Sequence, residues 1–195
     1  MICDGNFALC CGIDEAGRGP LAGPVCAAAV ILSEDFPLNL LDDSKKLTEA
    51  RRSEARLVIC EKAPAWGIGW ASHEEIDSIN ILQASLLAMK RAFEDLLQRT
   101  RFALDANTAA IVDGKFVPDI SIPCRAMVKA DAQVPEVMAA SILAKTERDI
   151  YMKKMAELYP QYGYEKHKGY PTKAHREAVL KYGPSPIQRL TFKVK

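Results

Sequence analysis

The stretch that decides the fold is residues 11–25, which reads CGIDEAGRGPLAGPV. An apolar run, residues 7–13, precedes two adjacent carboxylates, Asp14 and Glu15, and a turn of small residues with one arginine follows them. A second apolar run, residues 25–32, leaves the turn. Short apolar runs bounded by Gly and Pro are typical of strands. We therefore predict a buried strand, a tight turn and a second strand, with two negative charges where the first strand reaches the surface.

The composition is that of an ordinary globular protein. The chain has 195 residues, is 49% hydrophobic and carries 26 basic against 25 acidic residues, so its net charge of +1 gives no global sign of a polyanionic partner. This length suits one domain, or one domain with a small appendage. The six cysteines form no CxxC pair, which favours a reduced protein. We find neither a membrane span nor a signal peptide and expect a cytoplasmic protein.

Apolar periodicity predicts alternating strands and helices along the rest of the chain. Further strands are expected at residues 66–72, 109–112 and 122–128. Helices are expected at residues 48–61, 81–97, 134–158 and 172–182. Thr48 is a candidate N-cap of the first helix, and residues 77–80 offer several N-caps for the second.

Three apolar segments end in acids, which gives Asp14, Glu15, Asp113 and Asp131. If their strands are neighbours, the carboxylates converge and repel one another unless cations neutralise them. An acidic site without His or Cys ligands favours Mg²⁺ or Mn²⁺. Two such ions support phosphodiester hydrolysis. Acids also cap helices and solvate loops, so both interpretations stay open at this point.

Two basic segments are candidate phosphate contacts. Ser44 and Lys45 precede a predicted helix and could hold a phosphate, or they could belong to a solvated loop. On the predicted helix 134–158, Ser141, Lys145 and Arg148 share one face, which could follow a phosphate backbone or be ordinary surface. Four tyrosines interleaved with basic residues at 159–170 suit either base and sugar stacking or a loop that caps the core.

Five ordered motifs together resemble bacterial ribonuclease HII, the type 2 ribonuclease H. They are GIDEAGRGPLAGPV at 12–25, DSKKL at 43–47, VDG at 112–114, AASILAKTERD at 139–149 and HKGYPT at 167–172. The match extends from about residue 9 to residue 187. It implies an α/β fold with a ribonuclease H-like mixed sheet flanked by helices and a small C-terminal helical segment. Residues 1–195 would form one catalytic domain, whose part from about 159 to 195 supplies a substrate-contacting loop, a short helix and a tail.

The resemblance also implies an activity. The family hydrolyses the RNA strand of RNA/DNA hybrids and incises 5′ to single ribonucleotides embedded in duplex DNA, leaving 3′-hydroxyl and 5′-phosphate ends. Two Mg²⁺ or Mn²⁺ ions are expected with substrate bound. Partners would be the hybrid and the ribonucleotide-containing duplex, with no membrane, and the protein is expected to be a monomer.

Residue roles carry over by position. The metal-binding, catalytic acids would be Asp14, Glu15, Asp113 and Asp131, with Asp14 shared by both ions. Backbone groups of Gly17, Arg18 and Gly19 would meet the 2′-hydroxyl, and Tyr170 would pack on the sugar beside the RNA-to-DNA junction. Further phosphate contacts would be Ser44, Lys45, Lys145 and Arg148.

Two departures from the family pattern matter. Ala130 occupies a position where glycine is more usual. Alanine is tolerated there unless the backbone needs a positive φ. The tail, residues 186–195, is less arginine-rich than is common, and we assign it no contact with the duplex. Two alternatives stay open: another acid-dependent nuclease of related fold, such as a resolvase or exonuclease, and a non-catalytic nucleic-acid-binding module.

Overall fold

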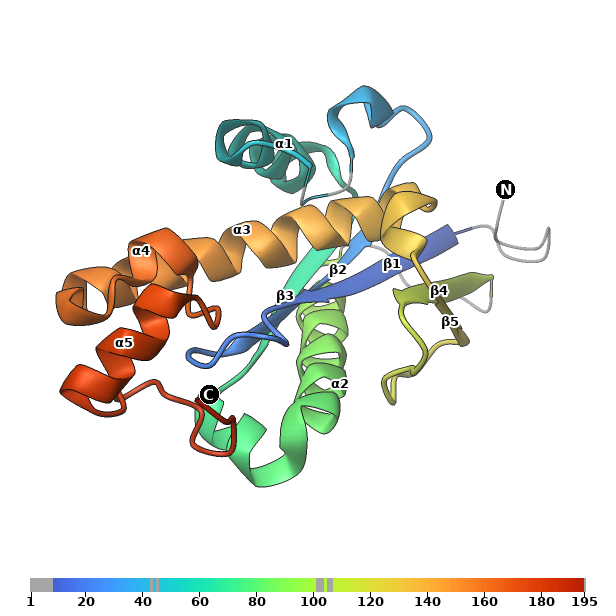
Figure 1. The fold of residues 1–195 in the computed structure, drawn as a ribbon. Coiled ribbons are helices and arrows are strands. Elements are labelled where there is room, and N and C mark those ends of the chain that lie inside the picture. Colours follow the sequence, from blue (N-terminus) through green and yellow to red (C-terminus); the bar gives the residue numbers. More distant parts are fainter. Residues whose placement is uncertain (1–8, 43, 45, 101–103, 105–106, 195) are drawn as a thin grey trace.

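The computed structural model describes residues 9–42, 44, 46–100, 104 and 107–194, and its elements follow the predicted alternation (Figure 1). The strands are β1 Leu9–Ala16, β2 Val25–Ile31, β3 Ala65–Ala71, β4 Thr108–Asp113 and β5 Cys124–Met127. The α-helices are α1 Glu49–Lys62, α2 His73–Arg99, α3 Pro135–Leu158, α4 Tyr164–His167 and α5 Lys173–Tyr182. Short 3₁₀ helices are η1 Leu38–Leu40, η2 Ala130–Ala132 and η3 Pro160–Tyr162.

The five strands form one mixed sheet in the order β3-β2-β1-β4-β5. β1 pairs antiparallel with β2 and parallel with β4, and β4 pairs parallel with β5. The carboxyl ends of β1, β4 and β5 therefore lie at the same edge of the sheet. Ile13 pairs with Val112, so Asp14 and Asp113 occupy neighbouring positions at that edge. This confirms the predicted mixed sheet and brings the first three acids together.

Helices cover both faces of the sheet, with α2 on one side and α1 and α3 on the other (Figure 1). Cys11 and Ile13 of β1 belong to the apolar cluster beneath α2, whereas Ala28 and Val30 of β2 pack against α1 and α3. Because side chains alternate along a strand, Asp14 lies on the α3 face. The acidic end of β1 is thereby placed against the middle of α3.

Local capping explains where the helices begin. Thr48 caps α1 as predicted, since its Oγ1 accepts a hydrogen bond from the backbone of the third helical residue. α2 begins earlier than predicted, because Ser72 and Glu75 form a capping box. Asn80, with φ of 67°, interrupts α2, and its Oδ1 accepts the N–H of Leu82 at 3.0 Å. The predicted start near residue 80 is therefore the start of the second segment of α2.

The C-terminal elements pack around the far end of α3 (Figure 1). Tyr162 and Tyr164 are buried there with Met152, and their rings stack with centroids 5.6 Å apart. These two tyrosines therefore belong to the core, which agrees with the interpretation of this segment as a loop that caps the core. No helix of the described residues combines the length and the apolar character that crossing a membrane requires.

Candidate active site

A cavity of about 230 Å³ opens at the carboxyl ends of β1 and β4. It is lined by Asp14, Glu15, Ala16, Gly17, Arg18, Gly19, Ser44, Asp113, Ser141, Lys145 and Tyr170. These residues come from β1 and its following loop, the loop before α1, β4, α3 and the segment before α5. Most of the residues predicted from the sequence for a site are thus brought into one cavity.

Asp14 is the most buried acid of the cavity, with 5% of its surface exposed. Its Oδ1 accepts the backbone N–H of Glu15 at 2.7 Å. Burial raises the pKa of Asp14 well above its ordinary value, and the charges of Glu15 and Asp113 raise it further. A hydrogen bond from Ser141 opposes this shift. Burial and like charges together disfavour the carboxylate, as expected for a site that a cation would complete.

Glu15 presents a carboxylate oxygen that the protein leaves unsatisfied. Its Oε1 lies 3.3 Å from Nη1 of Arg18, whereas its buried Oε2 has no hydrogen-bond partner among the described residues. Burial raises the pKa of Glu15 even though Arg18 lowers it. Because buried polar atoms are normally paired, this oxygen is a ready position for a ligand.

The two remaining acids are placed differently. Asp113 lines the cavity, and one of its carboxylate oxygens, Oδ1, accepts the N–H of Ala130 at 2.8 Å. Asp131 follows in η2, where it is buried, and is not one of the residues that line the cavity. The left-handed residue of this turn is Lys129, with φ of 61°, and not Ala130. Alanine is therefore compatible with the backbone here, while the role of Asp131 stays a prediction.

The acid set fits a hard divalent ion that keeps much of its own solvent. Among the described residues, no three His, Cys, Asp or Glu side chains are already gathered closely enough to hold an ion. Mg²⁺ is typically held by one or two carboxylates, with water and substrate phosphate completing the shell. Asp14, Asp113 and the unpaired oxygen of Glu15 offer donors of this kind.

The loop after β1 and Tyr170 line the same cavity. Gly17 has φ of +100°, and a Cβ added there would lie 2.0 Å from Nε of Arg148, so only glycine fits. A Cβ added at Gly19 would lie 3.8 Å from the ring of Tyr170. The ring of Tyr170 is partly exposed and lies 5.9 Å from Nζ of Lys145. An aromatic face and a glycine loop therefore border one space.

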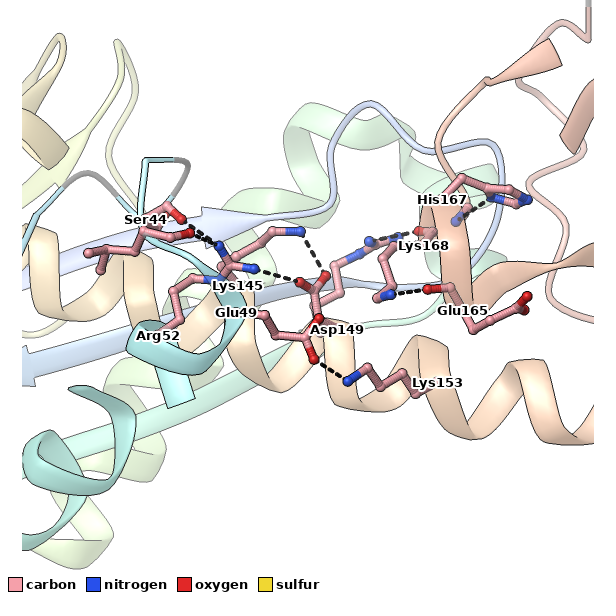
Figure 2. A network of polar contacts seen from close by, with 12 residues as sticks. Ser44, Glu49, Arg52, Lys145, Asp149, Lys153, Glu165, His167 and Lys168 are labelled. Atoms are coloured by element: carbon pink, nitrogen blue, oxygen red, sulfur yellow. Dashed lines mark hydrogen bonds and ion pairs between the residues drawn. The ribbon is translucent and has the colours of Figure 1, made fainter. Parts of the chain in front are cut away.

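Figure 2 shows the polar network beside the cavity. Nζ of Lys145 donates to Asp149 at 2.7 Å, and Arg52 approaches the same carboxylate at 3.6 Å. Arg52 also donates to the backbone carbonyl of Ser44, which ties the loop before α1 to α3. Lys145 and Ser44 both line the cavity, which agrees with their predicted phosphate contacts, and these contacts stay predictions. Lys45 lies outside the described residues.

Two residues differ from the sequence-based expectation. Arg148 is 1% exposed, and its guanidinium donates to the carbonyls of Pro24, Ala22 and Lys168. Arg148 is therefore enclosed and does not lie on an exposed face of α3 as expected, and its phosphate contact stays a prediction. Ser141, whose Oγ lies 2.9 Å from Oγ of Ser44, lines the cavity although it was assigned no individual role.

Comparison with known proteins gives one consistent family. The family described as Ribonuclease HII matches residues 11–195. The chain is 56% identical to the ribonuclease HII of Treponema denticola over 196 aligned residues, covering 96% of this chain and 99% of that protein. It is similar to a chain of the PCNA:RNase HII complex from Archaeoglobus fulgidus, with a TM-score of 0.74, 26% identity and 96% coverage of both chains. It also shares the fold of Bst-RNase HIII in complex with Mn²⁺, with a TM-score of 0.75, 18% identity, and coverage of 97% of this chain and 68% of that one.

Proposed function

The chain belongs to the ribonuclease HII family of nucleases, whose members cleave RNA in RNA/DNA hybrids, and we propose that it also incises 5′ to single ribonucleotides embedded in duplex DNA. The observation that carries this proposal is one cavity that joins an acidic edge to a glycine loop and an aromatic ring. The acids suit cleavage of a phosphodiester, and the loop suits close contact with a sugar. The products would carry 3′-hydroxyl and 5′-phosphate ends.

Asp14, Glu15 and Asp113 are the residues that we propose hold the metal ions, with Asp131 as a further ligand. Two Mg²⁺ or Mn²⁺ ions, when bound, supply an activated water and stabilise the leaving oxygen of the phosphodiester. Asp14 and Asp113 hold neighbouring positions because their strands pair in parallel. Arg18 pairs with one oxygen of Glu15, while the other oxygen has no hydrogen-bond partner within the part of the chain that the structure describes.

Recognition of the ribonucleotide would use backbone groups of residues 17–19. The 2′-hydroxyl is the group that distinguishes RNA from DNA at a given site. Glycine at position 17 lets the loop backbone pack against buried Arg148, since a side chain there would collide with it, and an added Cβ at Gly19 would face the ring of Tyr170. Tyr170, across from Gly19, would pack on the sugar beside the junction, and Lys145 and Ser44 would contact phosphate.

The test is cleavage of a DNA duplex that contains one ribonucleotide, with Mg²⁺ or Mn²⁺, with chelator, and beside an all-DNA duplex. We expect metal-dependent cutting only on the 5′ side of the ribonucleotide. Cutting of the all-DNA duplex would favour the resolvase or exonuclease alternative. Binding without any cutting would favour the non-catalytic binding module. Membership of the family argues against this alternative and against the resolvase or exonuclease alternative.

Asp14→Asn and Asp113→Asn are expected to abolish cleavage while leaving a folded protein that still binds duplex. Each substitution removes a negative charge that would hold a metal ion at the reacting phosphate, but it changes the volume of the side chain very little. Asp119→Asn is the matched control, because the side chain of Asp119 is 95% exposed and pairs with Lys90. Full activity of either cavity variant would contradict the metal assignment. We further propose that the enzyme acts as a cytoplasmic monomer, which sedimentation and cell fractionation would check.

A further inference from the structure

A buried arginine from the tail lies beneath the loop of residues 17–24. Arg189 is 0% exposed, and all the hydrogen bonds that its guanidinium donates within the described chain end on carbonyl oxygens of this loop. The acceptors are Gly17 at 2.6 Å, Pro20 and Gly23 at 2.8 Å, Arg18 at 3.0 Å and Pro24 at 3.2 Å. One side chain thus binds the backbone carbonyls of five of the eight residues in this loop.

The number of donors matches the number of acceptors. A guanidinium carries five N–H groups in a fixed planar fork, and each meets one of the five carbonyls. No N–H of Arg189 is left for a phosphate. Lysine, with three donors on a flexible stem, cannot satisfy the same set. The requirement at this position is therefore for arginine specifically, and for positioning rather than for charge attraction to substrate.

The inward carbonyls determine where the loop amides point. In a trans peptide the C=O of one residue and the N–H of the next point to opposite sides of the chain. The carbonyls of Gly17 and Arg18 face Arg189. The N–H groups of Arg18 and Gly19 are therefore turned away from Arg189, on residues that line the cavity. An acceptor oxygen of a ligand in the cavity could meet these two backbone donors.

The tail that carries Arg189 is anchored on both sides. Its backbone pairs with the loop, since Arg189 N–H donates to Leu21 at 2.9 Å and Gly23 N–H donates to Ile187 at 2.8 Å. Asp77 of α2 accepts the N–H of Leu190 at 2.7 Å and of Thr191 at 3.0 Å. The guanidinium is thus held by a fixed segment and not by a flexible end.

Burial and the neighbouring charge of Arg148 lower the pKa of Arg189 to about 9. This value still lies above neutral pH, so the side chain carries its proton and all five donors there. Arg148 supports the same loop through the carbonyls of Pro24 and Ala22. The loop therefore rests on two buried guanidinium groups.

We propose that Arg189 is a positioning residue that sets selectivity for a ribonucleotide by turning the amides of Arg18 and Gly19 toward the 2′-hydroxyl. This inference rests on the proposed function. It gives the tail, which contacts no duplex in the sequence-based expectation, an indirect part in recognition.

The test compares wild type with Arg189→Lys. Affinities are measured with Ca²⁺ in place of Mg²⁺, for a duplex with one ribonucleotide and for the same duplex in DNA alone. We expect Arg189→Lys to reduce the preference for the ribonucleotide by roughly five- to tenfold, about the value of one hydrogen bond, and to leave affinity for the all-DNA duplex unchanged. A merely structural role would lower both affinities by the same factor. Leu190→Ala, at a side chain that is 74% exposed in the same segment, is the control and should behave as wild type.

The outcomes separate the two proposals. A wild-type preference that Arg189→Lys retains overturns the role of Arg189 alone, whereas a wild type without preference overturns the proposed function and this inference together. If Arg189→Lys does not fold, hydrogen exchange of the wild type decides. The amides of Leu21, Gly23 and Arg189 should then exchange as one unit and slow together when the ribonucleotide duplex binds. Exchange of the tail amide faster than the loop amides would overturn the inference.

Discussion

Ser141 connects α3 to the acidic cavity through its hydroxyl group. Its Oγ lies 2.9 Å from Oγ of Ser44, and its hydrogen bond to Asp14 lowers the pKa of that acid against the effect of burial. A bond to a carboxylate is stronger than one between neutral groups. The charge available on Asp14 therefore depends in part on a neutral residue of the next element.

Ser141→Ala is expected to raise the Mg²⁺ concentration needed for half-maximal cleavage at neutral pH by about tenfold, the value of a hydrogen bond to a charged group. Without the hydroxyl, the pKa of Asp14 rises further, and a proton competes better with the metal. The increase should shrink as the pH is raised, because the competing proton is then removed. Cleavage rates over a series of Mg²⁺ concentrations at two pH values measure it.

Thr146→Val is the matched control for this prediction. Thr146 is a buried hydroxyl residue of the same helix, and its Oγ1 has no hydrogen-bond partner among the described residues. Its replacement should leave the Mg²⁺ requirement unchanged. An equal shift in both variants would mean that the effect comes from the helix and not from the contact with Asp14.

At the scale of residues, the sequence shows which side chains follow the end of a strand. It does not show which side chains become buried or which hydrogen-bond acceptors they then contact. Asp14 and Glu15 were predictable because charges directly after an apolar run must reach an edge. Arg148 shares helical spacing with Lys145, yet only the packed structure shows that Arg148 is enclosed. Arg189 offers no signal at all, since a single arginine in a tail has no pattern, and its acceptors lie more than 160 residues earlier.

At the scale of elements, α2 approaches β3 so closely that β3 needs glycine. A Cβ added at Gly69 would lie 2.0 Å from the carbonyl oxygen of Ala88, and one at Gly67 would lie 2.2 Å from the backbone N of Leu96. Both neighbours are backbone atoms of a helix and cannot rotate away. The glycines that alternate through this strand are therefore a packing requirement of the α2 face.

Gly69→Ala is expected to lower the free energy of unfolding by about 1–3 kcal/mol, the usual cost of overpacking a well-packed core. The added methyl group forces α2 away from the sheet. Urea denaturation measures the change. Gly19→Ala is the control for stability, since its added Cβ comes no closer than 3.8 Å to any atom outside its neighbours. Equal stability of Gly69→Ala and wild type would contradict the close approach.

Element positions were largely predictable because each has a local signal. Thr48 caps α1 as predicted, and α5 at Lys173–Tyr182 lies within one residue of its predicted bounds, 172–182. The start of α2 was missed because Ser72 and Glu75 form their capping box immediately after a strand, which the search for apolar periodicity passes over. The environment of α3 was not predictable either, because it is covered by the sheet, α1 and the C-terminal elements together.

At the scale of the whole molecule, two groups of titrating side chains make the stability of the fold depend on pH in opposite directions. Burial raises the pKa of Asp14 and Glu15 above ordinary values of 3.8 and 4.5. Burial lowers the pKa of His167 and His175, whose rings stack 4.5 Å apart in the C-terminal cluster, below 6.5. The acids bind protons more tightly in the folded state, so their contribution is lost as pH rises. The histidines bind protons less tightly when folded, so stability falls as pH drops below 6.5.

The metal-free protein should therefore be most stable at mildly acidic pH, and Mg²⁺ should stabilise it more at pH 8 than at pH 5. A cation offsets the repulsion between Asp14 and Glu15 that deprotonation creates. Each pKa unit is worth about 1.4 kcal/mol, or roughly 3–6 °C in Tm for a chain of this size. Thermal denaturation in chelator and in Mg²⁺ at both pH values measures the difference. Asp14→Asn should reduce the loss of stability at pH 8 in chelator, whereas Asp119→Asn should not. A Tm in chelator that rises steadily to pH 8 in wild type would show that the buried acids do not hold their protons in the folded protein.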